Sequence, residues 1–359
     1  MPPGLRAVAR PTYDALDPSP HDERGPVHVR ESYVKAAVRD HYGPPAVVRV
    51  EEIPTPTPLG DQVLVRVRAA SVNRADLDGL YPRWQFTRVF SGIRAPRLRA
   101  LGLDAAGTVE AVGPDATRFR VGDRVFGDLF SFGMGAFAEF ACAPEAAFAG
   151  MPDELSFEDA ATLPHSAILA IQGLRYRGGA TIRAGDRVLV AGASGNVGPF
   201  AVQLAKDRGA VVTGTARTEK LEFVRSLGAD EVIDYTTTDW TATRERYDWI
   251  LDVEARQSVL RARHALKRGG HYVSLGAPSL LLFDGMLVGP VVGRATGRSM
   301  SVLVWWKPFK GEDVAALLDL IAAGKVTPQI DRTYPLGEIV EALRYVDDGL
   351  SRGKVLVIP

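Results

Sequence analysis

The sequence predicts an α/β protein in which a small, barrel-like β domain precedes a doubly wound parallel sheet. In the second half of the chain, short apolar strands alternate with helical segments, which is typical of parallel sheets. In the first half, many short strands are separated by glycine and proline turns, which favours a small β barrel. The chain has 359 residues, 46% hydrophobic and 24% charged, which is sufficient for two globular domains.

The most informative stretch is residues 187–198, which read RVLVAGASGNVG. Apolar residues at its start predict a buried strand, and glycines at a three-residue spacing then precede a helical segment. Such a turn lets the pyrophosphate of a dinucleotide approach a backbone without Cβ atoms and contact the N–H groups of a helix N-terminus. We therefore predict a dinucleotide site that contains Gly192, Ser194, Gly195, Asn196, Val197 and Gly198.

The segments that follow strengthen this prediction, because a glycine turn alone marks many kinds of loop. Strands are expected at residues 210–216, 231–234, 247–253 and 271–275, and helices at residues 219–227 and 257–267. The ligand crevice of a doubly wound sheet lies at the carboxyl ends of its strands.

The elements outside this sheet are expected mainly in the β domain. Strands are expected at residues 34–38, 47–52, 62–70, 106–112, 124–126, 135–142 and 354–358, and the last of these is expected to rejoin the first domain. Helices are expected at residues 157–175, capped by Ser156, and at residues 311–323, ended by Gly324. We expect a loop with a short helix at residues 279–292.

The predicted domain organisation has three parts. Residues 1–32 are proline-rich and charged, and we interpret them as an extension that is disordered or ordered on contact. Residues 33–160 together with residues 308–359 form the β domain. Residues 161–307 form the dinucleotide domain.

Composition limits the partners and the compartment. Lys plus Arg and Asp plus Glu both number 43, so no net charge favours nucleic acid or an anionic membrane. The single cysteine, Cys142, excludes an intrachain disulfide framework and an all-cysteine zinc site, and it favours the reducing cytoplasm. We predict no membrane span, because no apolar run reaches about 20 residues. Acidic residues in the first 32 positions argue against a mitochondrial presequence.

Several short motifs, taken together, identify a family. They are SVNRAD at residues 71–76, GLDAAGTV at 102–109, VGDRVFG at 121–127, GAFAE at 135–139, LGAD at 227–230 and RGK at 352–354. With these motifs and the glycine turn, the chain resembles the zinc-independent quinone oxidoreductase-like branch of the medium-chain dehydrogenase/reductase superfamily. The resemblance implies a GroES-like β-barrel domain, a Rossmann domain, an active site between them and a homodimer.

The resemblance also implies that no metal is used. Zinc-dependent relatives resemble one another in a cysteine where this chain has Val72 or Asn73 and in a His-Glu pair where it has Leu103 and Asp104. Catalytic zinc needs about three protein ligands, and Asp104 alone does not supply them. A zinc-dependent alcohol dehydrogenase would require metal in the purified protein.

The end of the second strand of the dinucleotide domain predicts the cofactor. An acid at this position binds the ribose of NAD, whereas a cation accepts the 2′-phosphate of NADP. The chain has Arg217 there, followed by Lys220, and in related enzymes the tyrosine that matches Tyr235 contacts this phosphate. We predict NADPH, bound also by Leu275, Gly276 and Lys354. The alternative is that Arg217 and Lys220 only form a solvated helix start.

The chemistry implied by the resemblance is hydride transfer from NADPH to a quinone, an enone or a polyketide-like activated alkene. The expected substrate is therefore a small, hydrophobic, carbonyl-conjugated molecule. Asn73 matches a family asparagine near the nicotinamide, and Tyr81 matches a tyrosine over the substrate that can donate a proton or bind the developing oxyanion. The alternatives are that Asn73 caps its own turn and that Tyr81 is an aromatic lid.

Three further positions leave alternatives open. His165 is either a packing residue or a catalytic one. Leu169 replaces the usual threonine beside the nicotinamide, and Glu254 replaces the usual glycine near the cofactor crevice, which favours an alternative class, a non-catalytic NADPH-binding or scaffolding protein. Trp305 and Trp306 end a segment that lines a substrate pocket or a subunit interface.

Overall fold

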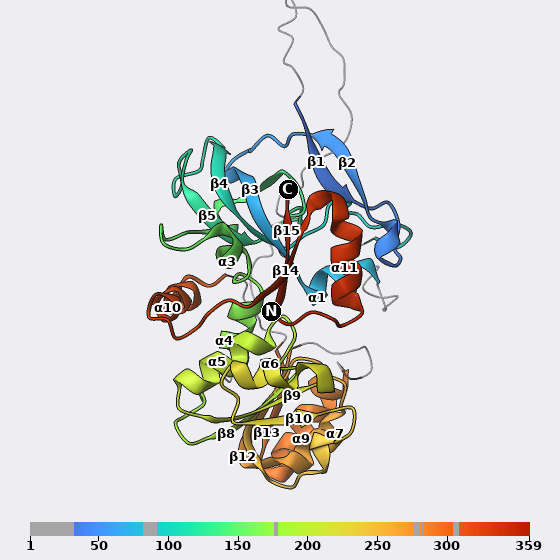
Figure 1. Ribbon diagram of the computed structural model, residues 1–359, viewed down its shortest axis with the longest axis vertical. Coiled ribbons are helices and arrows are strands. Elements are labelled where there is room, and N and C mark those ends of the chain that lie inside the picture. Colours follow the sequence, from blue (N-terminus) through green and yellow to red (C-terminus); the bar gives the residue numbers. More distant parts are fainter. Residues whose placement is uncertain (1–31, 82–91, 176–178, 276–280, 282, 304–308) are drawn as a thin grey trace, which may run out of the picture. The chain divides into compact units, whose positions relative to one another are not determined.

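The computed structural model describes residues 32–81, 92–175, 179–275, 281, 283–303 and 309–359. Tyr33–Pro359 form one compact unit that contains two large sheets (Figure 1). Among the helices of the described ranges, none has the length and apolar character needed to span a membrane. The predicted combination of a GroES-like β domain with a Rossmann-type parallel sheet is confirmed.

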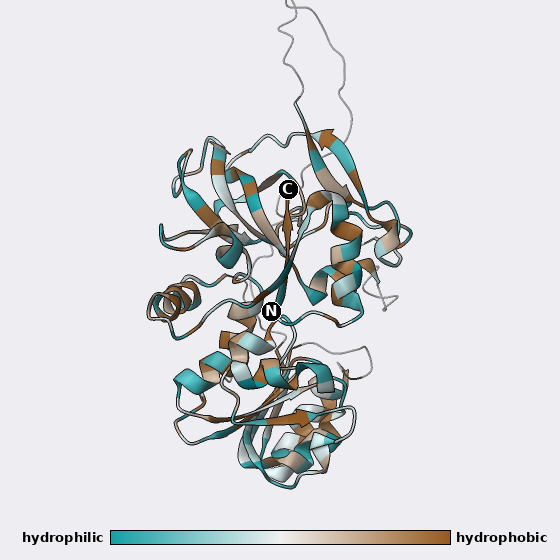
Figure 2. Cartoon of the chain, in the orientation of Figure 1, coloured by the Kyte–Doolittle hydropathy of each residue, from teal (hydrophilic) through white to brown (hydrophobic). Residues whose placement is uncertain are grey.

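The GroES-like sheet is organised around one long central strand. It has seven strands in the order β14-β15-β3-β4-β5-β7, with β6 also paired to β3. These strands are β3 (Gln62–Val72), β4 (Asp104–Val112), β5 (Arg124–Asp128), β6 (Phe140–Pro144), β7 (Phe148–Gly150), β14 (Ile330–Pro335) and β15 (Lys354–Ile358). The antiparallel pairing of β15 with β3 returns the C-terminal strand to the first domain, as predicted. In Figure 2, β15 is coloured as hydrophobic, in keeping with its burial.

Smaller elements complete this domain. A separate two-stranded sheet pairs β1 (Tyr33–Val38) with β2 (Arg49–Pro54), joined through the 3-10 helix η1 (Pro45–Val47). Helix α1 (Arg74–Leu80) and helix α11 (Ile339–Asp347), the latter after η6 (Leu336–Glu338), contribute side chains to the same apolar core as β3 and β4. Another 3-10 helix, η2 (Glu145–Ala147), precedes β7.

The second sheet is parallel and has six strands in the order β10-β9-β8-β11-β12-β13. Its strands are β8 (Arg187–Ala191), β9 (Val211–Ala216), β10 (Glu231–Asp234), β11 (Tyr247–Asp252), β12 (Leu266–Ser274) and β13 (Ser299–Val302). The helices after them are α5 (Gly198–Asp207), α6 (Leu221–Ser226), α7 (Val259–Ala265) and α9 (Gly289–Thr296), with η3 (Thr218–Lys220), η4 (Trp240–Ala242) and the π-helix η5 (Asp284–Val288) between elements. The strand order reverses between β8 and β11, which is where such sheets bind ligands.

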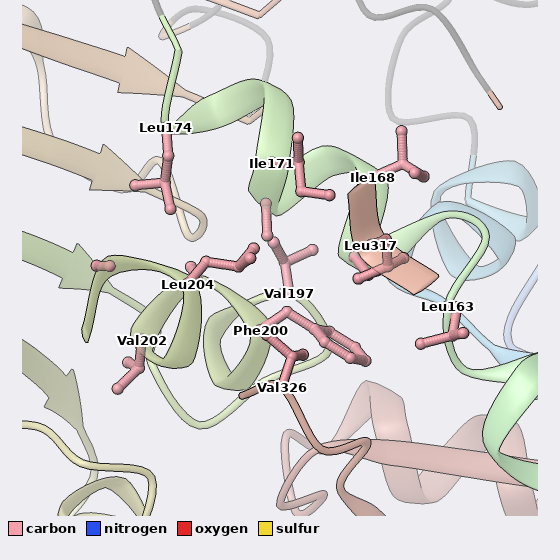
Figure 3. Packing of buried hydrophobic residues seen from close by; sticks show 14 of the residues in the cluster. Leu163, Ile168, Ile171, Leu174, Val197, Phe200, Val202, Leu204, Leu317 and Val326 are labelled. Carbon is pink, nitrogen blue, oxygen red and sulfur yellow. The ribbon is translucent and has the colours of Figure 1, made fainter. Parts of the chain in front are cut away.

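The main apolar core lies where three helices meet this sheet. Figure 3 shows side chains of α4 (Ser166–Gly173), α5 and α10 (Gly311–Ala322) packed together, among them Ile171, Phe200 and Leu317. A second cluster, with Tyr247 and Val259, involves α7. Truncating one of these buried large side chains to alanine typically costs about 2–5 kcal/mol, so this packing fixes the position of α4 beside the glycine turn.

The prediction of one continuous helix at residues 157–175 is wrong. The structure divides it into α3 (Phe157–Ala161) and α4, with Pro164 in the break. Proline lacks an N–H group and disfavours helical geometry in the residue before it, so the helix ends and restarts. The predicted cap is confirmed, because the Ser156 hydroxyl accepts a hydrogen bond from the Asp159 backbone N–H.

Other boundaries shift by a few residues. The strand expected from residue 135 starts only at Phe140, since Gly135 has a positive φ of 106°. Gly324, at φ 68°, follows α10 as expected. Residues 284–296 are more helical than predicted, because η5 runs directly into α9.

Candidate active site

The glycine turn after β8 has room for a ligand at one of its three glycines. A Cβ atom at Gly198 would lie 2.3 Å from the Gly192 carbonyl oxygen, and Gly192 itself has φ 83°, so both positions require glycine for the fold. Among the residues that the structure describes, a Cβ atom at Gly195 would meet only that same oxygen, at 3.7 Å, an ordinary contact. The described part of the chain therefore leaves the space beside Gly195 open, which fits the close approach of a pyrophosphate.

Polar contacts attach this turn to the GroES-like domain. The Asn196 side-chain amide donates to the Val72 carbonyl oxygen over 2.7 Å. The Gly353 backbone N–H donates to the Ser194 carbonyl oxygen over 3.0 Å. The turn thus meets the end of β3 and the start of β15. Val197, also predicted to bind the cofactor, is buried in the apolar core.

A pocket of about 380 Å³ opens beside the turn, at the carboxyl ends of the central parallel strands. Its lining includes Ala191 at the end of β8, Thr215 on β9, Tyr235 after β10 and Asp252 at the end of β11. This is the edge of the sheet at which the sequence predicts the cofactor crevice. Thr215 also connects the pocket to the turn, because its hydroxyl accepts a hydrogen bond from the Gly192 N–H over 3.1 Å.

Two guanidinium groups border Tyr235 in this region. Arg217 Nε donates to Tyr235 Oη over 3.0 Å, and this bond is the main reason why the pKa of Arg217 is raised. The guanidinium carbon of Arg256 lies 6.0 Å from the centre of the Tyr235 ring. Sequence reasoning identified Arg217 and Tyr235 but missed Arg256, because only the folding of the loop after β11 brings it to the end of β10.

Glu254, which lines the pocket, forms an ion pair with a neighbouring arginine. Its carboxylate forms an ion pair with Arg256 at 2.7 Å, and its Cγ atom lies where a Cβ atom at Gly192 would approach within 2.7 Å. The negative charge that replaces the expected glycine is therefore compensated by a cation on the same loop. This arrangement reduces the repulsion of a phosphate that Glu254 alone would cause.

The Lys220 side chain makes hydrogen bonds within the protein and does not line the pocket. Its ammonium group is buried and donates to the carbonyl oxygens of Gly349 and Ser351 over 2.6 and 2.7 Å. Burial lowers the pKa of Lys220. Arg352 adds a bond to the Glu219 carbonyl oxygen over 3.2 Å. The contact of Lys220 with the cofactor stays a prediction. Its contacts in the structure connect the parallel-sheet domain to the loop before β15.

Asn73 and Lys354 form the centre of a buried polar network. The Asn73 amide nitrogen donates to the Ser71 carbonyl oxygen and to Asp104 Oδ2, while Asn73 Oδ1 accepts from Ser166 Oγ and, at 2.7 Å, from Lys354 Nζ. Lys354, fully buried, donates its other two hydrogens to Ser166 Oγ and Asp104 Oδ2. All the hydrogen-bonding positions of the Asn73 amide and the Lys354 ammonium are thus occupied. The network joins β3, β4, α4 and β15.

This result changes how the predictions for Asn73 and Lys354 are interpreted. Burial lowers the pKa of Lys354, and the charge of Asp104 opposes that effect. Neither residue has a free hydrogen for a ligand in this arrangement. Their roles at the cofactor stay predictions, while their observed role is to position β3 and α4 around the glycine turn.

Tyr81 lies at the C-terminal end of α1 and is half-buried. Its hydroxyl donates to Asp347 Oδ2 over 2.8 Å. Sequence reasoning did not identify Asp347, the last residue of α11, as a partner of Tyr81. The two residues are 266 positions apart, so no local pattern relates them. The phenol that the family resemblance predicts over the substrate is thus oriented by a carboxylate.

His165 directly precedes α4 and contacts a second carboxylate that sequence reasoning missed. Its Nδ1 atom lies 3.0 Å from Asp128 Oδ2, at the end of β5. Its backbone N–H donates to Asp104 Oδ1 over 3.0 Å. Both side chains are buried, with 9% of the His165 side chain and none of the Asp128 side chain exposed.

The remaining predicted positions are placed as follows. The Leu275 N–H donates to the Asp252 carbonyl oxygen over 3.0 Å, at the edge of the pocket. Gly276, Trp305 and Trp306 lie outside the described residues. Within the ranges that the structure describes, no group of three or more His, Cys, Asp or Glu side chains is placed to hold a metal ion.

Comparisons with known families and proteins place this site in context. Residues 60–153 match the family described as alcohol dehydrogenase GroES-like domain, and residues 227–357 match the family described as zinc-binding dehydrogenase. The chain is 32% identical over 358 residues to the mitochondrial NAD(P)H oxidoreductase RTN4IP1 of Mus musculus, which covers 91% of this chain and 90% of that protein. It is 30% identical over 339 residues to the chloroplastic quinone-oxidoreductase QR1 of Triphysaria versicolor, with 91% and 98% covered.

Solved structures give the same result. The quinone oxidoreductase from Coxiella burnetii superimposes with a TM-score of 0.80 at 28% identity, covering 91% of this chain and all of that chain. The CurK enoyl reductase superimposes with a TM-score of 0.78 at 26% identity, covering 90% of this chain and 99% of that chain.

Proposed function

The chain belongs to the medium-chain dehydrogenase/reductase superfamily, in its zinc-independent quinone oxidoreductase-like branch, and is an NAD(P)H-dependent oxidoreductase. We propose that it uses NADPH to reduce a quinone, an enone or a related activated alkene. The observation that carries the choice of cofactor is the Arg217–Tyr235 hydrogen bond at the rim of the pocket. A guanidinium beside a phenol hydroxyl suits the 2′-phosphate, because both donate hydrogen bonds to phosphate oxygens.

The residues around the pocket fit the rest of the cofactor. The open space beside Gly195 receives the pyrophosphate, and Arg256, beside Tyr235, adds a second positive charge near the ribose. We propose that Gly192, Ser194, Gly195, Asn196, Val197 and Gly198 form the pyrophosphate turn, with Leu275 and Gly276 farther along the crevice. When bound, NADPH supplies the hydride that the acceptor needs.

The chain's own residues orient the acceptor and stabilise its developing charge. Charge accumulates on the conjugated oxygen as the hydride arrives, so a hydrogen-bond donor aimed at that oxygen lowers the barrier. Tyr81 is the proposed donor. Its hydroxyl has to exchange Asp347 for the substrate oxygen, and Asp347 is positioned to take the bond back after the product leaves. Asn73 and Lys354 act in this proposal as positioning residues, through the network beneath the turn.

The experiment that tests this function measures NADPH oxidation by the purified full chain with a panel of quinones and enones, in parallel with NADH. The expected result is turnover of at least one conjugated carbonyl acceptor, with kcat/KM at least tenfold higher for NADPH than for NADH. Equal use of the two cofactors would contradict the NADPH assignment. Cofactor binding without turnover of any acceptor in the panel would contradict the proposed substrate class.

We also propose that the protein is a cytoplasmic homodimer. Strand β13 lies at one end of the parallel sheet, and the segment before it exposes apolar side chains, with Leu287 at 66% and Val291 at 67% exposure. A strand that ends the sheet among the described residues, beside an apolar surface, suits pairing with a second copy of the chain. Light scattering after size-exclusion chromatography tests this. A monomer at micromolar concentration would contradict it.

A further inference from the structure

We propose that His165 is the proton donor of the proposed reduction and that Asp128 is the positioning residue that holds its imidazole for this task. The inference rests on the proposed function, because a reduced alkene or quinone needs one proton for every hydride it receives. The proton comes from His165, which directly precedes α4, and the imidazole is held by Asp128 at the end of β5.

The contacts of Asp128 determine how the imidazole is held. Asp128 Oδ1 accepts the Phe130 backbone N–H over 2.8 Å, while Asp128 Oδ2 lies 3.0 Å from His165 Nδ1. A carboxylate only accepts hydrogen bonds, so the proton between the two side chains belongs to Nδ1. The second ring nitrogen, Nε2, is then the atom that we assign to proton transfer.

The place of His165 in the fold connects this pair to the cofactor turn. The next residue, Ser166, donates to Asn73 Oδ1 over 3.1 Å. Asn73 follows Val72, whose carbonyl oxygen accepts the Asn196 amide of the glycine turn. His165 therefore lies where the end of β3, the start of α4 and the turn meet.

The face of α4 that follows His165 supports the same location. Leu169 is one helical turn further on, so it shares that face, and its N–H donates to the His165 carbonyl oxygen over 3.1 Å. Leu169 is only partly buried. The family resemblance predicts that position 169 lies beside the nicotinamide, and the spacing of four residues puts the imidazole on the same side of the helix.

The other candidate donor is committed to a different partner. The Tyr81 hydroxyl donates its hydrogen to Asp347, and a phenol gives up a proton reluctantly near neutral pH, whereas an imidazolium does so readily. We therefore separate the two roles. Tyr81 donates a hydrogen bond to the conjugated oxygen, and His165 transfers the proton.

The step balances as a two-electron reduction. A bound nicotinamide cofactor would supply the hydride that forms the new C–H bond at the β-carbon of the alkene, and the π electron pair would move to the α-carbon and the conjugated oxygen. The Nε2–H bond of the His165 imidazolium breaks as its proton joins that α-carbon, or the oxygen in a quinone. After the product has left, neutral His165 would regain its proton from the solvent.

The test compares four forms of the full chain: wild type, His165→Gln, Asp128→Asn and, as a matched control, His264→Gln on the exposed face of α7. Glutamine retains a donor for Asp128 but cannot transfer a proton. We expect His165→Gln to lower kcat by about 10²–10⁴-fold with the best acceptor, with the NADPH Kd from fluorescence titration within about twofold of wild type. Asp128→Asn is expected to lower kcat at least tenfold, and His264→Gln to leave it unchanged.

Two further readouts separate proton transfer from a structural role. In proton NMR without cofactor, the hydrogen-bonded Nδ1 proton of His165 is expected downfield in wild type and absent in Asp128→Asn and His165→Gln. The pH profile of kcat is expected to lose its alkaline limb in His165→Gln. Besides Asp128, the carboxyl groups of Asp104 and Asp76 interact electrostatically with His165, and neither is changed in either variant.

Each outcome decides the proposal. A kcat of His165→Gln within about threefold of wild type, or an unchanged pH profile, overturns the role of His165 while the proposed function stands. Absence of wild-type turnover with every acceptor overturns both. If His165→Gln does not fold, Asp128→Asn decides, because a downfield proton that survives this substitution, or an unchanged kcat, contradicts the pairing.

Discussion

The Tyr81 hydroxyl donates a 2.8 Å hydrogen bond to Asp347 Oδ2, which joins the C-terminal end of α1 to the last residue of α11. Arg74, at the start of α1, lies 3.5 Å from the other oxygen of the same carboxylate. One acid thus contacts both ends of α1. Because the phenol is already oriented, little conformational entropy remains to be lost when a substrate oxygen takes the place of Asp347.

The first prediction concerns this hydroxyl. Tyr81→Phe removes the proposed donor while keeping the ring, so we expect kcat to fall about 10²-fold and the NADPH Kd to stay within about twofold. Steady-state kinetics and fluorescence titration check this. Asp347→Asn is the companion variant, and because an amide still accepts the phenol hydrogen, its kcat should stay within about tenfold of wild type. Wild-type turnover by Tyr81→Phe would remove Tyr81 from the mechanism.

The second prediction uses two glycines of the same turn. Gly195→Ala places a methyl group in open space, so the free energy of unfolding should change by less than about 1 kcal/mol, while the NADPH Kd should rise at least tenfold because the methyl occupies the pyrophosphate site. Gly198→Ala places a Cβ atom 2.3 Å from a carbonyl oxygen and should destabilise the fold directly. Urea unfolding and NADPH titration separate the two effects. Unchanged affinity in Gly195→Ala would contradict the cofactor site.

The third prediction tests the guanidinium pair. Arg217→Ala removes a charged donor to the proposed 2′-phosphate, and such bonds contribute about 1.5–3 kcal/mol, so the NADPH Kd should rise about 10–100-fold while the NADH Kd changes little. Arg256→Ala should have a smaller effect of the same kind, because part of its charge is used by Glu254. Arg225→Ala, on the exposed side of α6, is the control. Equal losses of affinity for NADPH and NADH would show that Arg217 does not bind the 2′-phosphate.

The sequence was sufficient for features that depend on local spacing. The glycine turn, the strand alternation and the Arg217 position follow from residues close together in the chain, and the parallel sheet confirms their arrangement. Pro164 also carried a usable signal, since it breaks the helix predicted across it. Shifts of the strand ends reflect pairing partners that only the folded sheet supplies.

The contacts between distant residues had no such signal. His165 and Asp128 are 37 positions apart, and Tyr81 and Asp347 are 266 apart, so no periodicity relates them. Lys354 is a second case in which the sequence gives no signal for the contacts in the folded chain. It precedes the apolar strand VLVI, and the sequence alone does not reveal that its ammonium group is buried against Asp104 rather than presented to a phosphate.

The fourth prediction follows from that buried ammonium group. Lys354→Met leaves the Asp104 charge without its cation, so the free energy of unfolding should fall by about 3–5 kcal/mol. The control is Lys325→Met, which removes an exposed ion pair with Asp207 and should cost no more than about 1 kcal/mol. Urea unfolding followed by circular dichroism measures both. Equal effects would contradict a structural role for the network.

The last prediction concerns the pH dependence of stability at Asp76, which is buried at the start of α1. Burial, opposed by the Asn73 N–H and assisted by the charge of Asp104, raises the pKa of Asp76 from 3.8 to about 7. Among the described residues its Oδ1 atom has no hydrogen-bond partner, so the ionised form is poorly compensated.

The sign of the effect follows from proton binding. Between about pH 4 and pH 7 the folded state holds a proton at Asp76 that the unfolded state has lost, so the free energy of unfolding decreases as the pH rises through this window. The contribution is complete below about pH 4 and lost above about pH 7. Asp76→Asn removes this titration, so the fall in stability between pH 5 and pH 8 should be smaller than in wild type. Parallel curves for the two proteins, from urea unfolding at each pH, would contradict a raised pKa, because no other group is changed by the substitution.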